Sequence, residues 1–570
     1  MKREAILHIP MSEYAYGVDD ERVSLRIRTA RDDIVSCTLF YGDRASRKNP
    51  VDFIPVKMNK VAFTSLFDWY EVVFHSKYKR ICYYFQLFDN YGESILYYGD
   101  SFETKRSDNR SEYFQLPYNL CSDRIESPSW VEDAVVYNIF PDSFATDKRY
   151  ISSTPSSLYY KGYECKGLQG GSIKGIRENL DYIEEMGFNT IYLNPIFVAR
   201  EYHKYDLIDY YNIDPVFGGN EDFKDLVDDI HRRGMRIIID GVFNHSGWHF
   251  FAFEDVIKNG KTSKYWSWFY KLSEPVVVPL TWEEYPGYEC FGYERMMPKL
   301  ATDNPEVQEY FINVGKYWVE NYDIDGWRLD VASEVSDYFW IYFRKEIKKA
   351  KKDCLLIGEV WESAGHWLDG KMFDSTMNYD FRRHLLRYFA TEDIDTQEFN
   401  SRVTNMIMRY RWQVTLAQLN LLDSHDVSRF FSLCGCDERK MGLAVVFIFT
   451  FPGMPCVFYG DELGLEGEEE RDYRQPMDWK KKGGYLFDLY KELIGVRKRE
   501  KTLRDGLFVT ERITEEGVYI YSRRGEKTIR VIINRTNNNY YVKEDRILAQ
   551  RGYDCGVFAP YGFIIAREKE

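Results

Sequence analysis

The sequence lacks the long apolar runs of a membrane protein and the positive charge of a nucleic-acid-binding protein. No window approaches the length of a membrane span, and Lys2 and Arg3 near the N-terminus have no apolar stretch behind them. The formal net charge is -14 at pH 7, which disfavours a polyanionic partner. We therefore expect no nucleic-acid partner, no membrane partner and no secretory leader, and hence a cytoplasmic protein.

The cysteines also lack a pattern. The ten cysteines are scattered from Cys37 to Cys555 without repeated spacing. Cys434 and Cys436 are closest together, but no further ligand motif accompanies them. Free thiols in a reducing compartment explain this distribution better than a disulfide framework or a cysteine metal site.

The N-terminal part alternates between apolar and polar residues in the way that half-buried strands do. Residues 23–29, 36–41, 80–87 and 95–98 follow this pattern and are separated by Gly, Asp and Asn turns. Several short strands at this spacing predict an antiparallel β-sandwich. We assign residues 1–122 to it.

From Val131 onward short apolar strands alternate with helical patterns, which is typical of βα units around a parallel sheet. Eight candidate strands can be distinguished: Val135–Phe140, Thr190–Asn194, Arg236–Val242, Gly326–Val331, Leu355–Val360, a weaker one near Met377, Leu416–Leu422 and Pro455–Tyr459. Eight such units predict a (β/α)8 TIM barrel of the α/β class, which we assign to residues 123–498.

Two further parts flank or interrupt this barrel. The long stretch between His245 and Lys299 is rich in aromatic and turn residues, and we expect it to be a subdomain inserted after the third strand, at about residues 245–300. Strand alternation returns near Val518–Tyr521, which predicts a C-terminal β-sandwich over residues 499–570.

Acidic residues follow several of the predicted barrel strands. Asp240, Asp330, Glu359 and Asp426 come at or just after strands three, four, five and seven. A single aspartate at a strand end is more often a turn or helix cap. Four on one rim are hard to explain as caps, because crowded carboxylates raise each other's pKa, and such crowding usually marks a site.

Glycoside hydrolysis needs two carboxyl groups in different protonation states. Asp330 suits the nucleophile because Arg328, two residues earlier on a strand, points the same way and would keep the carboxylate ionised. Glu359 precedes Val360 and Trp361, and this apolar setting would raise its pKa as a general acid requires.

These strings resemble the α-amylase superfamily, glycoside hydrolase family 13, in order and spacing. The resemblance implies Asp330 as nucleophile, Glu359 as acid/base and Asp426 as a third carboxylate that binds sugar hydroxyls. It also implies a set of residues around the reacting sugar, namely His203, Tyr205, Asp240, His245, Arg328 and His425.

Within the superfamily, Met297-Pro298-Lys299-Leu300 resembles the neopullulanase, cyclomaltodextrinase and maltogenic amylase group. N-terminal strings such as Tyr41-Gly42-Asp43 resemble that group's N-terminal domain, which implies that residues 1–122 form a carbohydrate-binding-type domain. The resemblance implies that Glu334 and Trp361 shape the subsites beyond the cleaved bond, although Glu334 could equally be an exposed acid at a helix start. It implies that Arg474 holds sugar on the non-reducing side.

The chain departs from the group's pattern in several places. Ala301 and Ser333 replace side chains that are often amides, which leaves the balance of hydrolysis, transfer and α-1,6 cleavage open. Thr146 and Ser172 stand where many members carry Asn and Asp ligands for calcium, so we expect no metal ion there. Ala45 stands where relatives often have an aromatic residue that reaches a partner subunit.

We therefore expect a retaining enzyme that cleaves α-1,4 bonds in cyclodextrins, maltooligosaccharides or pullulan, with some transglycosylation. One alternative is an α-1,6-acting or mainly transferring relative on the same barrel. A remote alternative is a catalytically silent sugar-binding protein. The resemblance further implies a homodimer formed through the N-terminal domain.

Overall fold

The computed structural model describes residues 1–147, 157–160, 163–279, 281 and 283–569. The chain divides into two compact units. The first unit contains Met1–Glu126, Glu392–Leu416 and Asp505–Glu570, and the second contains Ser127–Thr391 and Ala417–Arg504.

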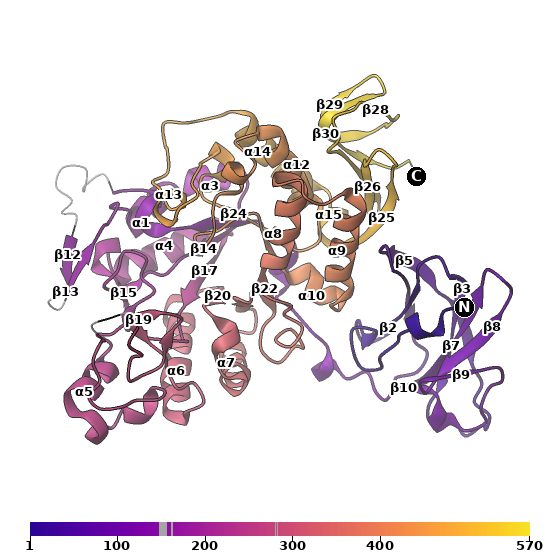
Figure 1. Ribbon diagram of the computed structural model, residues 1–570, viewed down its shortest axis with the longest axis horizontal. Coiled ribbons are helices and arrows are strands. Elements are labelled where there is room, and N and C mark those ends of the chain that lie inside the picture. Colours follow the sequence, from indigo (N-terminus) through magenta and orange to yellow (C-terminus); the bar gives the residue numbers. More distant parts are fainter. Residues whose placement is uncertain (148–156, 161–162, 280, 282, 570) are drawn as a thin grey trace. The chain divides into compact units, whose positions relative to one another are not determined.

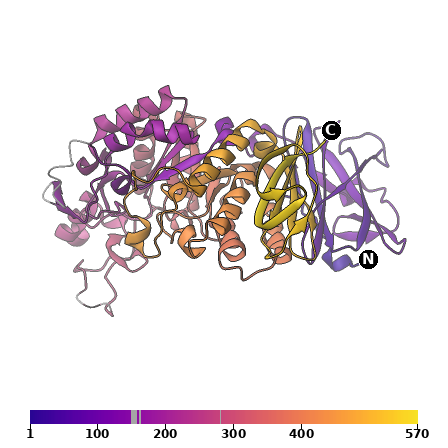
Figure 2. The same cartoon turned by 90° about the horizontal axis from the view of Figure 1, so that it is seen from above.

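The first unit begins with a sandwich of two antiparallel sheets, drawn in indigo and violet in Figures 1 and 2. One sheet has the order β1 (Ala15–Gly17), β2 (Arg22–Ala30), β6 (Phe67–His75) and β5 (Asn59–Phe63). The other has the order β4 (Ile54–Lys57), β3 (Ile34–Asp43), β7 (Ile81–Asp89), β8 (Ser94–Tyr98) and β9 (Ser101–Glu103), with β10 (Phe114–Leu116) paired to β7. Alternate residues such as Val23, Leu25 and Ile27 fill one shared core, as the sequence pattern predicts.

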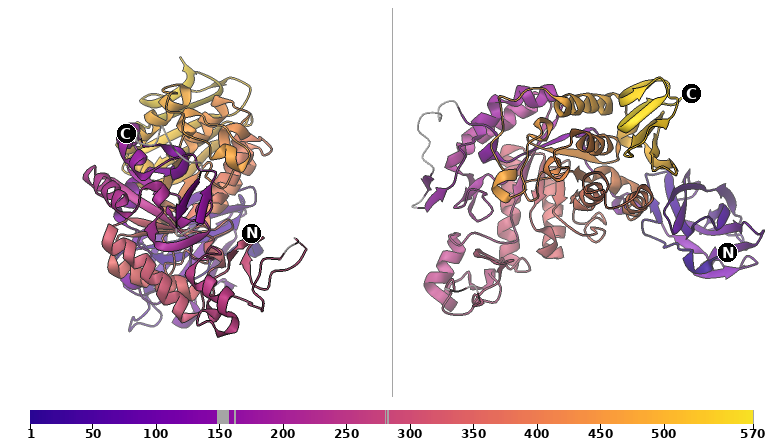
Figure 3. Two further views of the ribbon diagram at one scale, coloured as in Figure 1. Left: turned by 90° about the vertical axis from the view of Figure 1, so that its left-hand side faces the viewer. Right: turned by 45° about the horizontal axis from the view of Figure 1, so that its top comes forward.

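The C-terminal residues of the first unit form an antiparallel sheet, drawn in yellow in Figure 3. Its strands are β25 (Leu507–Ile513), β26 (Tyr519–Arg524), β27 (Thr528–Asn534), β28 (Tyr540–Tyr541), β29 (Ile547–Asp554) and β30 (Val557–Arg567).

Helix α9 (Thr396–Met408) lies within the range predicted for the barrel but belongs to the first unit. Its Asn400 side chain donates a hydrogen bond to the Phe63 carbonyl oxygen at 2.9 Å and accepts from the hydroxyls of Thr510 and Tyr519 at 2.6 and 3.1 Å. One amide therefore joins three distant stretches of the chain.

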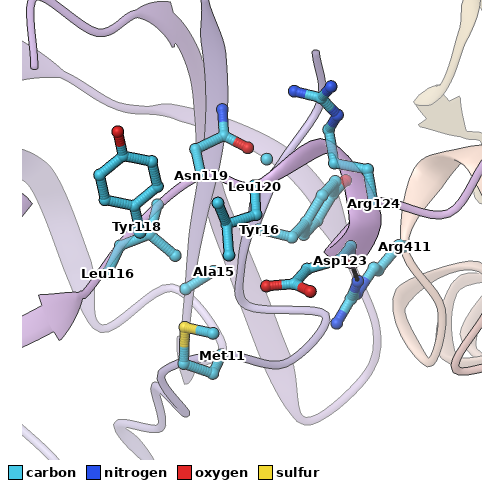
Figure 4. Close-up of a pocket in the computed structure, with 11 residues that line it drawn as sticks. Met11, Ala15, Tyr16, Leu116, Tyr118, Asn119, Leu120, Asp123, Arg124 and Arg411 are labelled. Atoms are coloured by element: carbon cyan, nitrogen blue, oxygen red, sulfur yellow. Dashed lines mark hydrogen bonds between the residues drawn. The ribbon is translucent and has the colours of Figure 1, made fainter. Parts of the chain in front are cut away.

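Figure 4 shows a small recess in this unit, where Tyr118 to Arg124 pass close to Tyr16 and Arg411. The Arg411 guanidinium lies over the Tyr16 ring at 5.8 Å, and Trp412 donates its backbone N–H to the Tyr16 hydroxyl at 3.2 Å. The recess has a volume of only about 30 Å³, which accommodates water but not a sugar ring.

The second unit is built on a closed barrel of parallel strands, as predicted. In order around the barrel they are β11 (Val136–Ile139), β14 (Thr190–Leu193), β17 (Arg236–Gly241), β20 (Gly326–Leu329), β21 (Leu355–Gly358), β22 (Ser375–Asn378), β23 (Leu419–Leu421) and β24 (Met454–Phe458). Nearly all their residues are buried, which explains why they appear in the sequence as short continuous apolar runs.

Helices surround this barrel (Figure 1). The longer ones are α2 (Ile173–Glu178), α3 (Leu180–Met186), α4 (Asn220–Arg232), α6 (Pro305–Tyr322), α7 (Asp337–Ala350), α8 (Tyr379–Leu385), α12 (Glu438–Thr450) and α14 (Tyr485–Arg499). The Asn304 side chain caps α6 by accepting the Glu306 N–H at 2.9 Å, and Pro305 fits the first turn because its missing N–H needs no partner there.

Two excursions from the barrel carry site residues. The hairpin β15 (Phe197–Ala199) and β16 (Leu207–Ile213) follows the second strand. Helix α5 (Phe251–Asn259) and the hairpin β18 (Cys290–Phe291) and β19 (Glu294–Pro298) follow the third. In the part of the chain that the structure describes, no helix is both long and apolar enough to cross a membrane.

Candidate active site

The acidic residues at the predicted strand ends meet at the carboxyl end of the barrel. In the parallel ladder Asp240 of β17 pairs with Arg328 of β20, and Leu329 pairs with Gly358 of β21. Asp330 and Glu359 follow Leu329 and Gly358 directly, so register places both carboxyl groups at one rim.

Arg328 is the centre of the cluster, and its side chain is fully buried. Its Nη1 atom lies 3.0 Å from Asp240 Oδ1 and 2.7 Å from Asp330 Oδ1. Its Nη2 atom lies 3.0 Å from Glu359 Oε1 and 3.6 Å from Asp426 Oδ2. One guanidinium thus neutralises part of the charge of four carboxylates, and its Nη1 atom donates hydrogen bonds to two of them, Asp240 and Asp330.

The electrostatics of Asp330 differ from the expectation. Burial raises the pKa of Asp330 well above its ordinary value, and the carboxylates of Glu359, Asp240 and Asp426 raise it further, against the opposing effect of Arg328. Arg328 lowers the pKa of Asp330, as expected, but burial and the three neighbouring carboxylates together shift this pKa in the opposite direction.

Asp426 shows the opposite behaviour. Burial acts to raise its pKa, but His425, Arg328 and Arg474 together hold the pKa of this carboxyl below its usual range. Its Oδ2 atom lies 2.9 Å from His425 Nε2, and its Oδ1 atom lies 3.5 Å from Arg474 Nη2. Asp426 is therefore ionised at neutral pH.

The surroundings of Glu359 are polar rather than apolar. Its Oε2 atom accepts the backbone N–H of Val331 at 2.8 Å, and its Oε1 atom accepts the indole N–H of Trp361 at 3.1 Å. Val331 has a φ of 45°, which is a strained conformation for a β-branched residue. This strain lets the N–H next to Asp330 reach Glu359 and couples the positions of the two carboxyl groups.

Tyr205 and His425 form a second layer with residues that the sequence analysis did not identify. The Tyr205 hydroxyl donates to Asp240 Oδ2 at 3.1 Å, and the rings of Tyr205 and His425 stack at 5.7 Å. Asn194 Nδ2 lies 2.7 Å from His425 Nδ1, and His425 Nε2 lies 2.5 Å from the Tyr205 hydroxyl oxygen and 2.9 Å from Asp426 Oδ2. Asn138 in turn donates to Asn194 Oδ1 at 3.1 Å. Asn138 lies in the first barrel strand and Asn194 directly follows the second. A buried amide within or at the end of an apolar run was the signal that could have identified them.

The two remaining histidines are neutral at physiological pH. Burial lowers the pKa of His203 to about 4 and that of His245 to about 3. His245 Nε2 lies 3.2 Å from the Tyr205 carbonyl oxygen, and the Phe291 ring of the inserted hairpin stacks on His245 at 4.9 Å. His203 Nδ1 accepts the Tyr205 N–H at 3.0 Å.

Arg474 connects Asp426 to the loop that follows the last barrel strand. It is buried, donates from Nε to the His425 carbonyl oxygen at 2.6 Å and donates from Nη1 to Glu470 and Tyr202 at 2.5 and 3.0 Å. Glu470 and Tyr202 were not predicted. The structure brings Arg474 to the cluster, next to Asp426.

Glu334 and Trp361 are the two residues expected to shape the subsites beyond the cleaved bond. Glu334 Oε2 is 3.0 Å from Lys299 Nζ, and Lys299 also donates to Asn244, so Glu334 is half-exposed but paired. Trp361 stacks on buried Tyr379 with ring centroids 3.7 Å apart while 43% of it stays exposed. This fixed ring offers a flat apolar face to a ligand.

The loop that carries His425 and Asp426 is held by a residue with no obvious sequence signal. Arg429 is fully buried and donates to the carbonyl oxygens of Tyr459 at 2.8 Å and Tyr473 at 3.1 Å and to Asp461 at 2.8 Å. The Phe430 N–H donates to Asp423 Oδ2 at 2.7 Å. Both ends of the catalytic loop are therefore anchored.

Ser172 and Thr146, at which the sequence predicts no calcium site, make local contacts. The Ser172 hydroxyl caps helix α2 by accepting the Gly175 N–H at 3.0 Å. Thr146 forms an isolated β-bridge with Gly171.

Comparison with known proteins identifies the family of this chain. Residues 138–485 match the family described as alpha amylase, catalytic domain, and residues 1–119 match the alpha amylase N-terminal ig-like domain. A cyclomaltodextrinase of Thermoanaerobacter pseudethanolicus is 38% identical over 94% of this chain and 93% of its own. Neopullulanase 2 of Thermoactinomyces vulgaris is 39% identical over 89% of this chain and 86% of its own.

A solved structure of a cyclomaltodextrinase has a TM-score of 0.89 and 35% identity, covering 100% of this chain and 98% of that one. The similarity extends over the barrel and over the flanking β domains, and it confirms both the predicted fold class and the predicted group. The chain belongs to the α-amylase family and is a glycoside hydrolase.

Proposed function

We propose that this enzyme cleaves α-1,4-glucosidic bonds in cyclodextrins, maltooligosaccharides or pullulan with retention of configuration. The proposal rests on two ion pairs: Asp330 and Glu359 each pair with one of the two terminal nitrogens of the buried Arg328 guanidinium. This arrangement keeps two carboxyl groups close together, as a double displacement requires.

In the first step Asp330 attacks the anomeric carbon, the bond to the leaving oxygen breaks, and Glu359 gives that oxygen its proton. A glycosyl ester on Asp330 results. In the second step Glu359 removes a proton from water, the water oxygen attacks the same carbon, and Asp330 leaves as a carboxylate. Each step passes through a positively charged sugar, which ionised Asp426 and the neighbouring carboxylates stabilise.

The sequence of steps needs one proton on the Asp330–Glu359 pair. Burial and mutual repulsion, which raise the pKa of Asp330, support retention of one proton at neutral pH. His203 and His245, with pKa values lowered by burial, are neutral and add no competing positive charge.

Proton NMR of the first product tests retention. We expect the α-anomer to appear first and then to equilibrate with the β-anomer. An initial β-anomer would refute the double displacement.

The substrate class rests on the names of the relatives, which are a cyclomaltodextrinase, a neopullulanase and a maltogenic α-amylase. The second candidate, an α-1,6-acting or mainly transferring enzyme, is favoured by Ala301 and Ser333 near the Lys299–Glu334 pair. A panel of β-cyclodextrin, maltotriose, pullulan, panose and soluble starch, with products separated by chromatography, decides between the two.

We propose two further properties with this function. A Bacillus subtilis relative named intracellular maltogenic amylase is 37% identical over 88% of this chain, which supports action on short saccharides in the cytoplasm. Dimerisation through the N-terminal domain is the expected state, and light scattering after size-exclusion chromatography tests it. A monomer across the working concentration range would exclude it.

A further inference from the structure

A groove lies between helices α6 and α7, which run side by side on the outside of the barrel (Figure 1). Its volume is about 440 Å³, which is within the usual size of ligand sites. Its lining includes Gln308, Glu309, Ile312, Asn313 and Lys316 of α6 and Tyr342 of α7. The α6 residues recur at three- and four-residue intervals and so form one continuous wall.

Helix α7 exposes several large side chains, of which Tyr342 lines this groove. Tyr338 is 79% exposed, Tyr342 is 44% exposed and Ile341 is 38% exposed, whereas Phe339 and Phe343 on the opposite face are buried. Tyr338 and Tyr342 are four residues apart and therefore share one face of the helix. A cluster of exposed rings next to a cavity is typical of a binding surface.

The groove also offers unused polar groups. Within the described part of the chain, the side chains of Glu309 and Asn313 have no hydrogen-bond partner. The Gln308 amide donates to the Thr302 carbonyl oxygen at 2.9 Å, which leaves its own oxygen available. Amide and carboxylate groups next to the flat face of a tyrosine can bind the hydroxyls and the apolar face of a sugar together.

We infer that the α6–α7 groove is a second binding site for an α-glucan chain, separate from the pocket at the barrel rim. The lining carries Glu309, Glu346 and one cation, Lys316, so it disfavours anions. A neutral ligand with many hydroxyl groups fits both the rings and the amides. The identity of the sugar rests on the proposed function.

Calorimetric titration with maltoheptaose tests the inference on the full chain. Asp330→Asn serves as the background so that the sugar is not consumed, and Tyr342→Ala and Asn313→Ala are added separately. We expect each to weaken the second binding event roughly tenfold, about 1.4 kcal/mol, with the first event unchanged. Tyr91→Ala is the matched control, because Tyr91 is 91% exposed and lies in the N-terminal sandwich.

Unchanged binding in both groove variants would overturn the inference. A change in sedimentation but not in binding would also overturn it, and would assign the exposed tyrosines to contact with a second copy of the chain. Hydrolysis of maltoheptaose by the unmodified enzyme is measured in parallel. Failure of hydrolysis with intact groove binding refutes only the proposed function, whereas hydrolysis with unchanged binding in the variants refutes only the groove.

Discussion

Two buried arginines at the same barrel rim, Arg328 and Arg429, differ in the groups that they contact. Arg328 contacts four carboxylates, of which Asp426 keeps 24% of its side chain exposed. Arg429 contacts backbone carbonyl oxygens and one carboxylate, that of Asp461, and both groups are buried.

The difference shows how charge is used in the two places. Around Arg328 negative charge is left in excess, and this excess can stabilise a positively charged sugar. Around Arg429 the Nε and Nη1 donors bind two backbone carbonyl oxygens and the Asp461 carboxylate, which fixes the loop and balances the charge of the guanidinium. The cluster around Arg328 therefore takes part in the reaction, whereas the contacts of Arg429 hold the loop in place. The following substitutions test this difference.

The largest effect is expected for Asp330→Asn. Because the variant loses the attacking group, kcat should fall by roughly 10³-fold or more. Steady-state kinetics on maltotriose measures it, with Asp353→Asn on the surface as control. Near-normal activity would remove the assignment.

The same variant should also be more stable at neutral pH. The pKa of Asp330 in the folded chain lies above its ordinary value of 3.8, so ionisation opposes folding and stability falls as pH rises above about 4. Asn cannot ionise, so the melting temperature of the variant should exceed that of the parent at pH 7 and match it below pH 3.8. An equal difference at both pH values would contradict the electrostatic account.

Arg429→Lys and Arg429→Met address the positioning role. Since a small displacement of Asp426 misaligns the reacting groups, kcat should fall by roughly 10²-fold in the Met variant while KM changes less. Lys keeps the charge and should recover part of the loss. If only the melting temperature falls, Arg429 stabilises the fold without positioning the loop.

Trp361→Phe separates two contacts of one side chain. The variant keeps a ring on Tyr379 but removes the N–H bond to Glu359. We expect kcat to fall by about fivefold to tenfold, as for the loss of one ordinary hydrogen bond, with the ratio of transfer to hydrolysis unchanged. Trp361→Ala should lower that ratio as well, and product analysis by chromatography distinguishes the two.

His245→Gln should make stability less sensitive to acid. In the folded chain burial lowers the pKa of His245 from 6.5 to about 3. Between these two pH values the unfolded state therefore binds a proton at this side chain and the folded state does not. Stability therefore falls as pH drops below 6.5, by at most about 1.4 kcal/mol per pH unit for one group. Melting curves between pH 6.5 and 4 should show a shallower slope for the variant, and an identical slope would exclude His245 as a contributor.

The smallest effect is expected on removal of metal ions. Because Ser172 caps a helix, and Thr146 stands where the family resemblance predicts an amide ligand in other members, we expect a chelator to leave the melting temperature unchanged. A large decrease would show that another group of oxygen atoms holds an ion.

Much of this site could be predicted because the barrel strands are short apolar runs with polar residues at one end. Register then brings Asp240, Asp330 and Glu359 together. Arg429 could not be found in this way, since its partners are mostly carbonyl oxygens, which every residue has. The altered pKa of Asp330 also escaped prediction, because it depends on the total charge and burial of a cluster rather than on a neighbour in sequence.

The hydrogen bonds of Asn400 have a consequence for how the protein is made. The first 126 residues leave the ribosome long before Glu392–Leu416 and Asp505–Glu570, the segments with which they share a unit. The whole second unit, which ends at Arg504, is synthesised before Phe63, Thr510 and Tyr519 can meet around this amide. A chain whose synthesis stopped before Thr510 would leave the Asn400 side chain without two of its three hydrogen-bond partners. The first unit can therefore be completed only after synthesis has passed Tyr519.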